Sequence, residues 1–90
     1  MARVELDDLK RFELAAAKGT SGALYNLGLI FSVGKGVAPD LVTAHKWFNL
    51  AAMRGSVEAR AQRKELADMM SPAEIAEAQR QAREWMASHA

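Results

Sequence analysis

Apolar residues recur at intervals of three and four along most of this chain, which is the spacing of an amphipathic α-helix. Short polar or glycine-containing segments separate five such stretches, and no stretch alternates with the period of two that marks a half-buried strand. The pattern therefore predicts an all-α protein of five successive antiparallel helices. The predicted helices cover residues 4–18, 21–33, 41–54 and 57–70, and a last one that begins at 72.

The apolar positions of each predicted helix define the face that we expect to be buried. In chain order these faces are Leu6, Leu9, Leu14 and Ala17; Ala23, Leu24, Leu27, Ile30 and Phe31; Leu41, Ala44, Phe48, Ala51 and Ala52; Ala59, Leu66 and Met70; and Ile75, Ala78, Ala82, Trp85 and Met86. Trp47 and Trp85 have apolar neighbours at helical spacing, so we interpret them as packing residues rather than recognition aromatics. We expect flexible methionine side chains to fill core space at Met53, Met69, Met70 and Met86.

Residues suited to helix ends stand at each predicted boundary. The predicted stops are Gly19, Gly34 and Gly55, and the predicted N-caps are Thr20 or Ser21, Asp40, Ser56 and Ser71. Glycine adopts the left-handed backbone that commonly follows a last helical turn, and we expect this conformation at Gly34. Pro72 and Glu74 complete a capping box with Ser71, with proline at the first helical position.

Gly28 lies inside the predicted helix over residues 21–33. Glycine in a helix interior costs ~1 kcal/mol relative to alanine. We therefore expect another part of the chain to approach Gly28 closely, and the following helix offers three small side chains for this contact, Ala44, Ala51 and Ala52.

The glycines and the lysine of "LGLIFSVGKGVAPD", residues 27–40, resemble a phosphate-binding loop at first sight. The P-loop pattern requires four residues between its first glycine and the Gly-Lys pair, followed by Ser or Thr. Here five residues separate Gly28 from Gly34, and Gly36 follows Lys35. The dinucleotide pattern fails as well, because Pro39 stands where its last glycine would be. We therefore expect Gly34 and Gly36 to shape a turn, and we expect no nucleotide cofactor.

A short motif occurs twice in the chain. The sequence "LAAAKG" at 14–19 returns as "LAAMRG" at 50–55, an offset of 50 − 14 = 36 residues. At the same offset Phe12 matches Phe48, and Ala23 matches Ala59. A period in the thirties is typical of one helix–turn–helix unit of an α-solenoid.

Residues 23–55 resemble the Sel-one-like repeat, a relative of the tetratricopeptide repeat. The positions that carry the resemblance are Ala23, Leu27, Gly28, Phe31, Gly34, Gly36, Val37, Asp40, Ala44, Trp47, Ala51, Ala52 and Gly55. The resemblance lapses outside this segment, where Arg11 stands in place of Trp47 and Arg63–Lys64 in place of Leu27–Gly28. It implies one domain over residues 1–90, a short right-handed α/α solenoid. One full repeat covers about 20–55, with partial or capping repeats at 1–19 and 56–90.

The charge of the chain is balanced. The 90 residues carry 12 basic and 11 acidic side chains, and the formal net charge is +1. Arg60, Arg63 and Lys64 lie close to Glu58 and Glu65, which we interpret as a mixed, solvated helix face. Nucleic-acid binding, including binding by a helix-turn-helix, would require a clearer basic footprint. We expect no nucleic-acid partner.

The sequence contains no cysteine, no run of about 20 apolar residues and no visible export signal. We therefore expect no membrane insertion and a cytoplasmic location. We also expect a bacterial protein. Its histidines, His45 and His89, are isolated, whereas zinc requires three or four clustered ligands. We expect no metal, no cofactor, no catalytic residue and no enzymatic activity.

A possible interaction surface lies on the helix over 21–33. At 100° per residue Leu27 centres the buried stripe, and Tyr25 and Leu29 point nearly opposite, with Asn26 beside them. Two interpretations of this pair stay open. In one, the pair forms the bottom of a peptide-binding groove; in the other, it packs under the first helix or in a self-association contact. The repeat offset places equivalent residues on the fourth helix, namely Gln62, Glu65 and Met69.

The resemblance implies a protein-interaction module, an adaptor or scaffold that binds a peptide or protein partner on the concave helical face. The alternative is a small self-associating regulatory or structural subunit without a peptide groove. Repeat stacks usually require at least three repeats for stability, and this chain has one full repeat. We therefore also expect a homodimer at high concentration.

Overall fold

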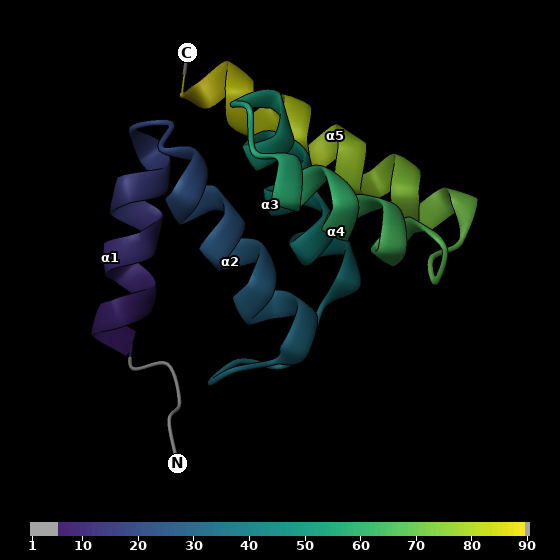
Figure 1. Cartoon of the computed structure of the whole chain (residues 1–90), viewed down its shortest axis with the longest axis horizontal. Helices are drawn as coiled ribbons and strands as arrows, with labels where there is room; N and C mark the ends of the chain where they lie inside the picture. Colours follow the sequence, from purple (N-terminus) through teal and green to yellow (C-terminus); the bar gives the residue numbers. More distant parts are fainter. Residues whose placement is uncertain (1–5, 90) are drawn as a thin grey trace.

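The computed structural model describes residues 6–89, and these form five α-helices joined by short turns (Figure 1). The helices are α1 (Leu6–Ala17), α2 (Ser21–Val33), α3 (Leu41–Met53), α4 (Val57–Ala67) and α5 (Pro72–Ser88). No strand occurs within residues 6–89, so the predicted all-α class is confirmed. The helices from α1 to α4 pack in sequence order, and α5 packs against α3. The central helix α3 thus has neighbours in α2, α4 and α5.

The predicted helix boundaries that fall on described residues agree with the structure to within one residue, except at the end of the fourth helix. The predicted start at Val4 lies outside the described residues. The helix predicted to reach residue 70 ends at Ala67, and Asp68 and Met69 form a turn. The reason lies in the following cap. Ser71 is extended, with ψ 159°, because it precedes Pro72 and caps α5, so the chain must leave the helix before it.

Side-chain caps hold the starts of α3, α4 and α5 as predicted. The Thr43 amide donates to Asp40 Oδ1 at 3.1 Å, and the Ala59 amide donates to Ser56 Oγ at 3.1 Å. At Ser71 the capping box is complete: the Glu74 amide donates to Ser71 Oγ at 3.1 Å, and the Ser71 amide donates to Glu74 Oε1 at 2.8 Å. Thr20 is the N-cap of α2, without a side-chain hydrogen bond.

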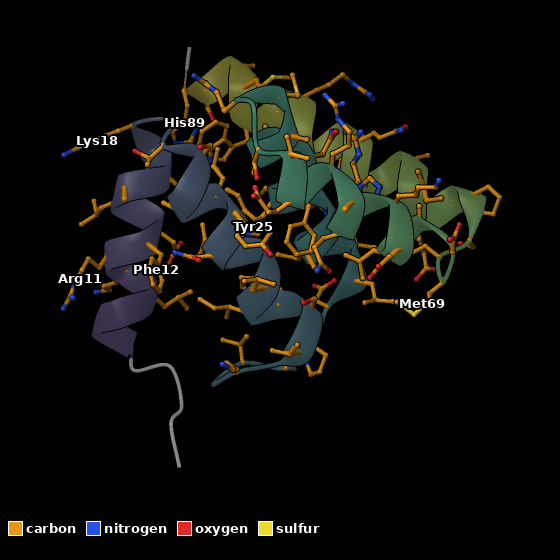
Figure 2. The ribbon with its side chains drawn as sticks, viewed as in Figure 1. Arg11, Phe12, Lys18, Tyr25, Met69 and His89 are labelled. Atoms are coloured by element: carbon orange, nitrogen blue, oxygen red, sulfur yellow. The ribbon has the colours of Figure 1, made fainter. Side chains whose placement is uncertain are left out.

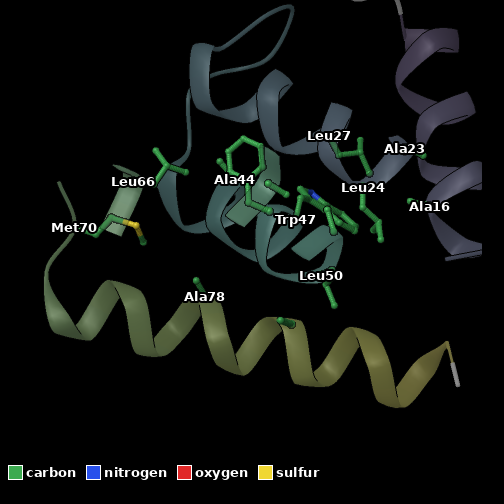
Figure 3. Close-up of a cluster of buried hydrophobic side chains, with 14 residues drawn as sticks. Ala16, Ala23, Leu24, Leu27, Ala44, Trp47, Leu50, Leu66, Met70 and Ala78 are labelled. Carbon is green, nitrogen blue, oxygen red and sulfur yellow. The ribbon is translucent and has the colours of Figure 1, made fainter. Parts of the chain in front are cut away.

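The core is centred on α2 and α3 (Figure 3). The largest fully buried side chains are Leu24, Leu27, Phe48 and Leu50. Buried alanines extend this cluster to the other helices, at Ala16, Ala59, Ala78 and Ala82. The predicted stripe of α5 is confirmed, since Ile75, Trp85 and Met86 pack against the same cluster.

The predicted buried face of α1 is partly wrong. Leu14 is 69% exposed and Ala17 is exposed, whereas Leu9 and Phe12 pack against the core and Ala16 is fully buried. Among the described elements α1 packs only against α2, so a narrow stripe suffices, and Leu9, Phe12 and Ala16 supply it at spacings of three and four. Two of the four expected core methionines, Met53 and Met69, are exposed as well.

Gly28 permits the closest approach between α2 and α3. A Cβ atom added there would lie 2.4 Å from two ring atoms of Phe48, a separation that packed atoms do not adopt. The expected close approach is therefore correct, but the partner is a phenylalanine ring rather than the alanines 44, 51 and 52. The ring of Tyr25 lies on the same side of α2, with its centroid 5.7 Å from that of Phe48.

Gly34 turns the chain from α2 towards α3. Its φ is 76° and its ψ is 40°, the predicted left-handed conformation. The amides of Gly34 and Lys35 both donate to the Ile30 carbonyl, at 2.9 and 3.1 Å. A Cβ at Gly34 would also lie 2.6 Å from Pro39 Cγ. The residues from Gly34 to Asp40 are therefore a structural turn that leads into the α3 cap.

The contact between Gly28 and Phe48 leads to the first prediction. Gly28→Ala places a methyl group where the ring stands, so we expect the free energy of unfolding to fall by ~1–3 kcal/mol, the range for overpacked cores. Urea denaturation measures this change. Gly22→Ala is the matched control, because its Cβ meets no atom within 4 Å. We expect it to raise stability by up to ~1 kcal/mol through helix propensity. Equal midpoints for the two variants would contradict the packing account.

Candidate functional site

The residues predicted for an interaction surface on α2 do not form one outward patch. Tyr25 and Leu29 are both half-buried and pack against the core cluster. Tyr25 contacts Phe48 of α3, whereas Leu29 belongs to a hollow beside α1. The angle of 100° per residue places both side chains opposite Leu27, but it contains no information on neighbouring helices. In the structure Phe48 of α3 covers Tyr25, and α1 lies beside Leu29. Of the two interpretations left open, packing agrees with the half-burial of both residues. Leu29 lies beside α1 as that interpretation expects, whereas Tyr25 packs on Phe48 instead.

A hollow of about 350 Å³ lies between α1 and α2. It is lined by Phe12, Asn26, Leu29, Ile30, Val33 and Lys35, and we call it the α1–α2 hollow. In Figure 2 Phe12 points from α1 towards α2, whereas Arg11 points away from it. The lining is mostly apolar, with an amide and an ammonium group as its polar members. Asn26 makes no side-chain hydrogen bond to any of residues 6–89, so its amide is free to pair with a guest.

The predicted residues of α4 are dispersed. Gln62 is half-buried and Glu65 is exposed. Met69 is 65% exposed and lies in the turn after α4, because the helix ends at Ala67. The α1–α2 hollow includes none of these three residues and does not include Tyr25. The structure thus brings together Asn26 and Leu29 from the predicted surface.

The predicted structural positions lie in the core and turns. Gly28 packs under Phe48, Asp40 caps α3, and Gly34, Gly36 and Gly55 have positive φ angles in turns. Trp47 is 8% exposed, and its ring meets that of Trp85 edge to face, with centroids 6.1 Å apart. The interpretation of both tryptophans as packing residues is confirmed.

A second hollow, of about 550 Å³, lies over the two tryptophans. Its lining comes from α1, α3 and the C-terminal part of the described chain: Lys10, Glu13, Leu14, Lys46, Trp47, Trp85 and His89. The Lys46 Nζ lies 4.3 Å from the Trp47 ring centroid, and burial lowers the pKa of Lys46. Glu13 and Glu84 act in the opposite direction. The hollow therefore joins an aromatic floor to charges of both signs.

A third hollow, of about 720 Å³, is a groove between α4 and α5 whose floor is α3. We call it the α4–α5 groove. Its lining residues are His45, Asn49, Val57, Arg60, Ala61, Arg63, Lys64, Ala67, Ile75 and Gln79. The pattern of α4 in the sequence does not indicate this groove. Arg60 and Lys64 are exposed, in agreement with the predicted solvated face, but no acidic side chain of the described residues lines the groove. The groove exists because α5 packs across α3 rather than along α4.

His45 lies on the floor of this groove and is 3% exposed. Its Nδ1 atom is buried and has no hydrogen-bond partner among residues 6–89. Burial lowers the pKa of His45, and the positive charge of Arg63 lowers it further. The sequence analysis treated His45 as an isolated residue, although its position four residues after Leu41 and three before Phe48 could have indicated burial.

The described residues offer little that indicates a metal site or a membrane span. The side chains described for residues 9–89 include no cluster of three histidine, aspartate or glutamate residues that could hold a metal. No helix of the described chain is long and apolar enough to span a membrane. The strongest ion pairing is on the exposed surface of α5, where hydrogen bonds from Arg80 and Gln81 lower the pKa of Glu77 to about 2. This network is a surface feature of one helix.

Comparison with known families agrees with the sequence resemblance. Residues 21–56 match the model of the Sel1 repeat family. The matched segment begins at α2, includes α3 and ends at the Ser56 cap of α4. No curated protein matches the chain.

The burial of His45 leads to a prediction on pH. Above about pH 6.5 the His45 imidazole is neutral in both the folded and the unfolded chain. Below about pH 6.5 the unfolded chain binds a proton at this imidazole, whereas the folded chain binds it only at a lower pH. Stability is therefore complete above pH 6.5 and falls as the pH decreases below it, by at most ~1.4 kcal/mol per pH unit for one proton. Urea denaturation between pH 7.5 and 5.5, at intervals, measures this slope. His45→Gln should reduce it, and His89→Gln should leave it unchanged. Equal slopes in both variants would refute the assignment.

Proposed function

We propose that this chain, in which residues 21–56 are a Sel1 repeat, is a protein-interaction module that binds a peptide segment on its concave helical face. Sel1 repeats are generally non-catalytic modules of protein–protein interaction. In this proposal residues 1–90 form one domain, and the helices on either side of the repeat cap it. The peptide crosses α2 at Asn26 and Leu29 and continues towards Gln62 and Glu65 of α4.

The observation that supports this proposal is the α1–α2 hollow. Phe12, Leu29 and Ile30 provide an apolar bottom, and Val33 at the rim is 60% exposed. A peptide inserts an apolar side chain into such a site, and the hydrophobic gain is largest where the pocket is already formed. The free amide of Asn26 can both donate to and accept from one peptide group. The hollow thus offers an anchor together with a backbone contact.

The test uses peptides selected from a random library against the wild-type chain, after depletion on the double variant Asn26→Ala, Leu29→Ser. We expect the selected peptides to bind the double variant at least about thirtyfold more weakly, since buried hot-spot residues typically contribute more than ~2 kcal/mol. Fluorescence anisotropy measures the affinities. Tyr25 stays unchanged because its ring supports Phe48.

The controls separate binding from stability. Leu27 is fully buried, so Leu27→Ala should lower the free energy of unfolding by ~2–5 kcal/mol, whereas the double variant should lose far less. Arg60→Glu with Lys64→Glu changes the α4–α5 groove and should not alter the binding of these peptides. A library that yields no binder after depletion, or binders unaffected by the double variant, would contradict the proposal.

A second candidate, self-association, is favoured by the exposure of Leu14. This residue is 69% exposed on α1 and adjoins the hollow over the two tryptophans. A second copy of the chain would bury it, as an exposed leucine beside an aromatic floor favours an apolar contact.

Self-association can be measured by sedimentation equilibrium. We expect wild-type chains to dimerise at high concentration and Leu14→Glu to weaken the dimer by roughly tenfold or more, because a charge would enter the apolar contact. Val57→Glu is the matched control, since Val57 is 71% exposed and lies on α4, away from this surface. A wild-type chain that remains monomeric at millimolar concentration would exclude this candidate.

A further inference from the structure

The charged side chains of α4 are divided between two sides of the helix. At 100° per residue Arg60, Arg63 and Lys64 fall within an arc of about 100°, and Glu58 and Glu65 lie about 150–170° from its centre. In the structure the three basic residues line the α4–α5 groove and the two glutamates do not. The balanced net charge of the chain therefore conceals a strongly basic side of α4.

The basic side chains have no anionic partner within residues 6–89. Arg60, Arg63 and Lys64 form no ion pair there, and Arg63 donates to the neutral amide oxygen of Asn49 at 2.6 Å. This hydrogen bond fixes one guanidinium over the floor of the groove. From α5 the groove receives two uncharged residues, Ile75 and Gln79. Three positive charges thus face one hollow without compensation.

The floor of the groove adds an independent observation. His45 is almost fully buried there, and its Nδ1 atom lacks a hydrogen-bond partner in the described chain. Such atoms are rare, because an unpaired buried polar group loses its hydrogen bonds to water without replacement. The walls are apolar over a large part of their extent, at Val57, Ala61, Ala67 and Ile75. The groove thus combines apolar walls, a basic rim and an unsatisfied polar floor.

We propose that the α4–α5 groove binds an acidic segment of a protein partner, in which an apolar side chain is flanked by glutamate or aspartate residues. The apolar side chain packs between Val57 and Ile75, and the flanking carboxylates pair with Arg60, Arg63 and Lys64. Guanidinium groups pair well with carboxylates because their hydrogen-bond geometries match. A volume of about 720 Å³ lies within the usual range for a pocket that takes several side chains.

The lining favours an acidic peptide over a nucleic acid. Single-stranded nucleic acids bind on aromatic side chains that stack with bases, and the groove has neither phenylalanine, tyrosine nor tryptophan in its lining. Nucleic-acid binding also usually requires a basic surface larger than one helix, whereas the net charge here is +1. Inorganic phosphate has no apolar group that could pack against the apolar walls. They suit a segment that carries both charge and an apolar side chain.

The groove is separate from the surface of the proposed function. The α4–α5 groove and the α1–α2 hollow share no lining residue. Gln62 and Glu65 are also absent from the groove lining, on the other side of α4. Loss of binding at either site can therefore be measured while the other stays intact.

The experiment uses a fluorescent synthetic peptide in which a Leu-Leu pair is flanked on both sides by glutamates, and a second peptide in which glutamine replaces each glutamate. Binding is measured by anisotropy to the wild-type chain and to two double variants. Arg60→Glu with Lys64→Glu alters the groove. Lys18→Glu with Arg83→Glu is the matched control, because it changes the net charge equally at exposed sites outside the groove. Melting curves check that both variants fold.

We expect the groove variant to weaken binding of the glutamate peptide by roughly tenfold or more, and the control variant to leave it nearly unchanged. The glutamine peptide should bind roughly tenfold more weakly than the glutamate peptide, and added salt should weaken the latter. Equal weakening by the two double variants would overturn the proposal, since it would indicate unspecific attraction. Absence of binding by the glutamate peptide would also overturn the proposal. So would a competition experiment in which a single-stranded oligonucleotide displaces the labelled glutamate peptide at a lower concentration than the unlabelled peptide does.

His45 supplies a readout inside the groove. A bound carboxylate offsets the charge of Arg63, so the glutamate peptide should raise the pKa of His45, followed through its imidazole resonances by NMR. The glutamine peptide should not do so, and the His89 resonances serve as an internal reference. Binding of the glutamate peptide without any change at His45 would place the peptide elsewhere and refute the assignment.

Discussion

The contact between the Phe48 ring and the backbone of Gly28 is the constraint on which the rest of the structure depends. It sets how closely α2 and α3 approach, because a side chain at Gly28 would collide with the ring at 2.4 Å. Leu24, Leu27 and Leu50 are fully buried around this pair of helices, and Tyr25 packs on the same ring. Both α4 and α5 pack on α3, so the helix that this contact joins to α2 is also the one that supports the later helices.

The α4–α5 groove exists because α5 does not pack along α4. Both α4 and α5 pack on α3, and α5 makes its main contact there rather than along α4. The small side chains of Ala78 and Ala82 allow α5 to lie close to α3, while Trp85 meets Trp47 edge to face. In the space that remains between α4 and α5, the basic side of α4 lies beside the floor that contains the buried His45.

The two proposed binding sites differ in the interaction that would contribute most to the binding free energy. The α1–α2 hollow offers apolar surface with one free amide, so burial of an apolar anchor would supply most of the affinity there. The α4–α5 groove adds three uncompensated cations, so charge would govern partner choice and association rate. The two sites share no lining residue, so the two proposals are independent of each other.

The sequence by itself determined the helices, their caps and the left-handed turn at Gly34, because these depend on interactions between residues three to five positions apart. It also showed that something must approach Gly28. Only the tertiary structure decided that this partner is Phe48, that Tyr25 and Leu29 are covered from different sides, and that Leu14 faces out. Helical periodicity ranks the faces of one helix, but it contains no information on which neighbour covers each face. For the same reason the division of charge on α4 could be read from the sequence, whereas the groove that collects those charges with His45 arises only when α5 crosses α3.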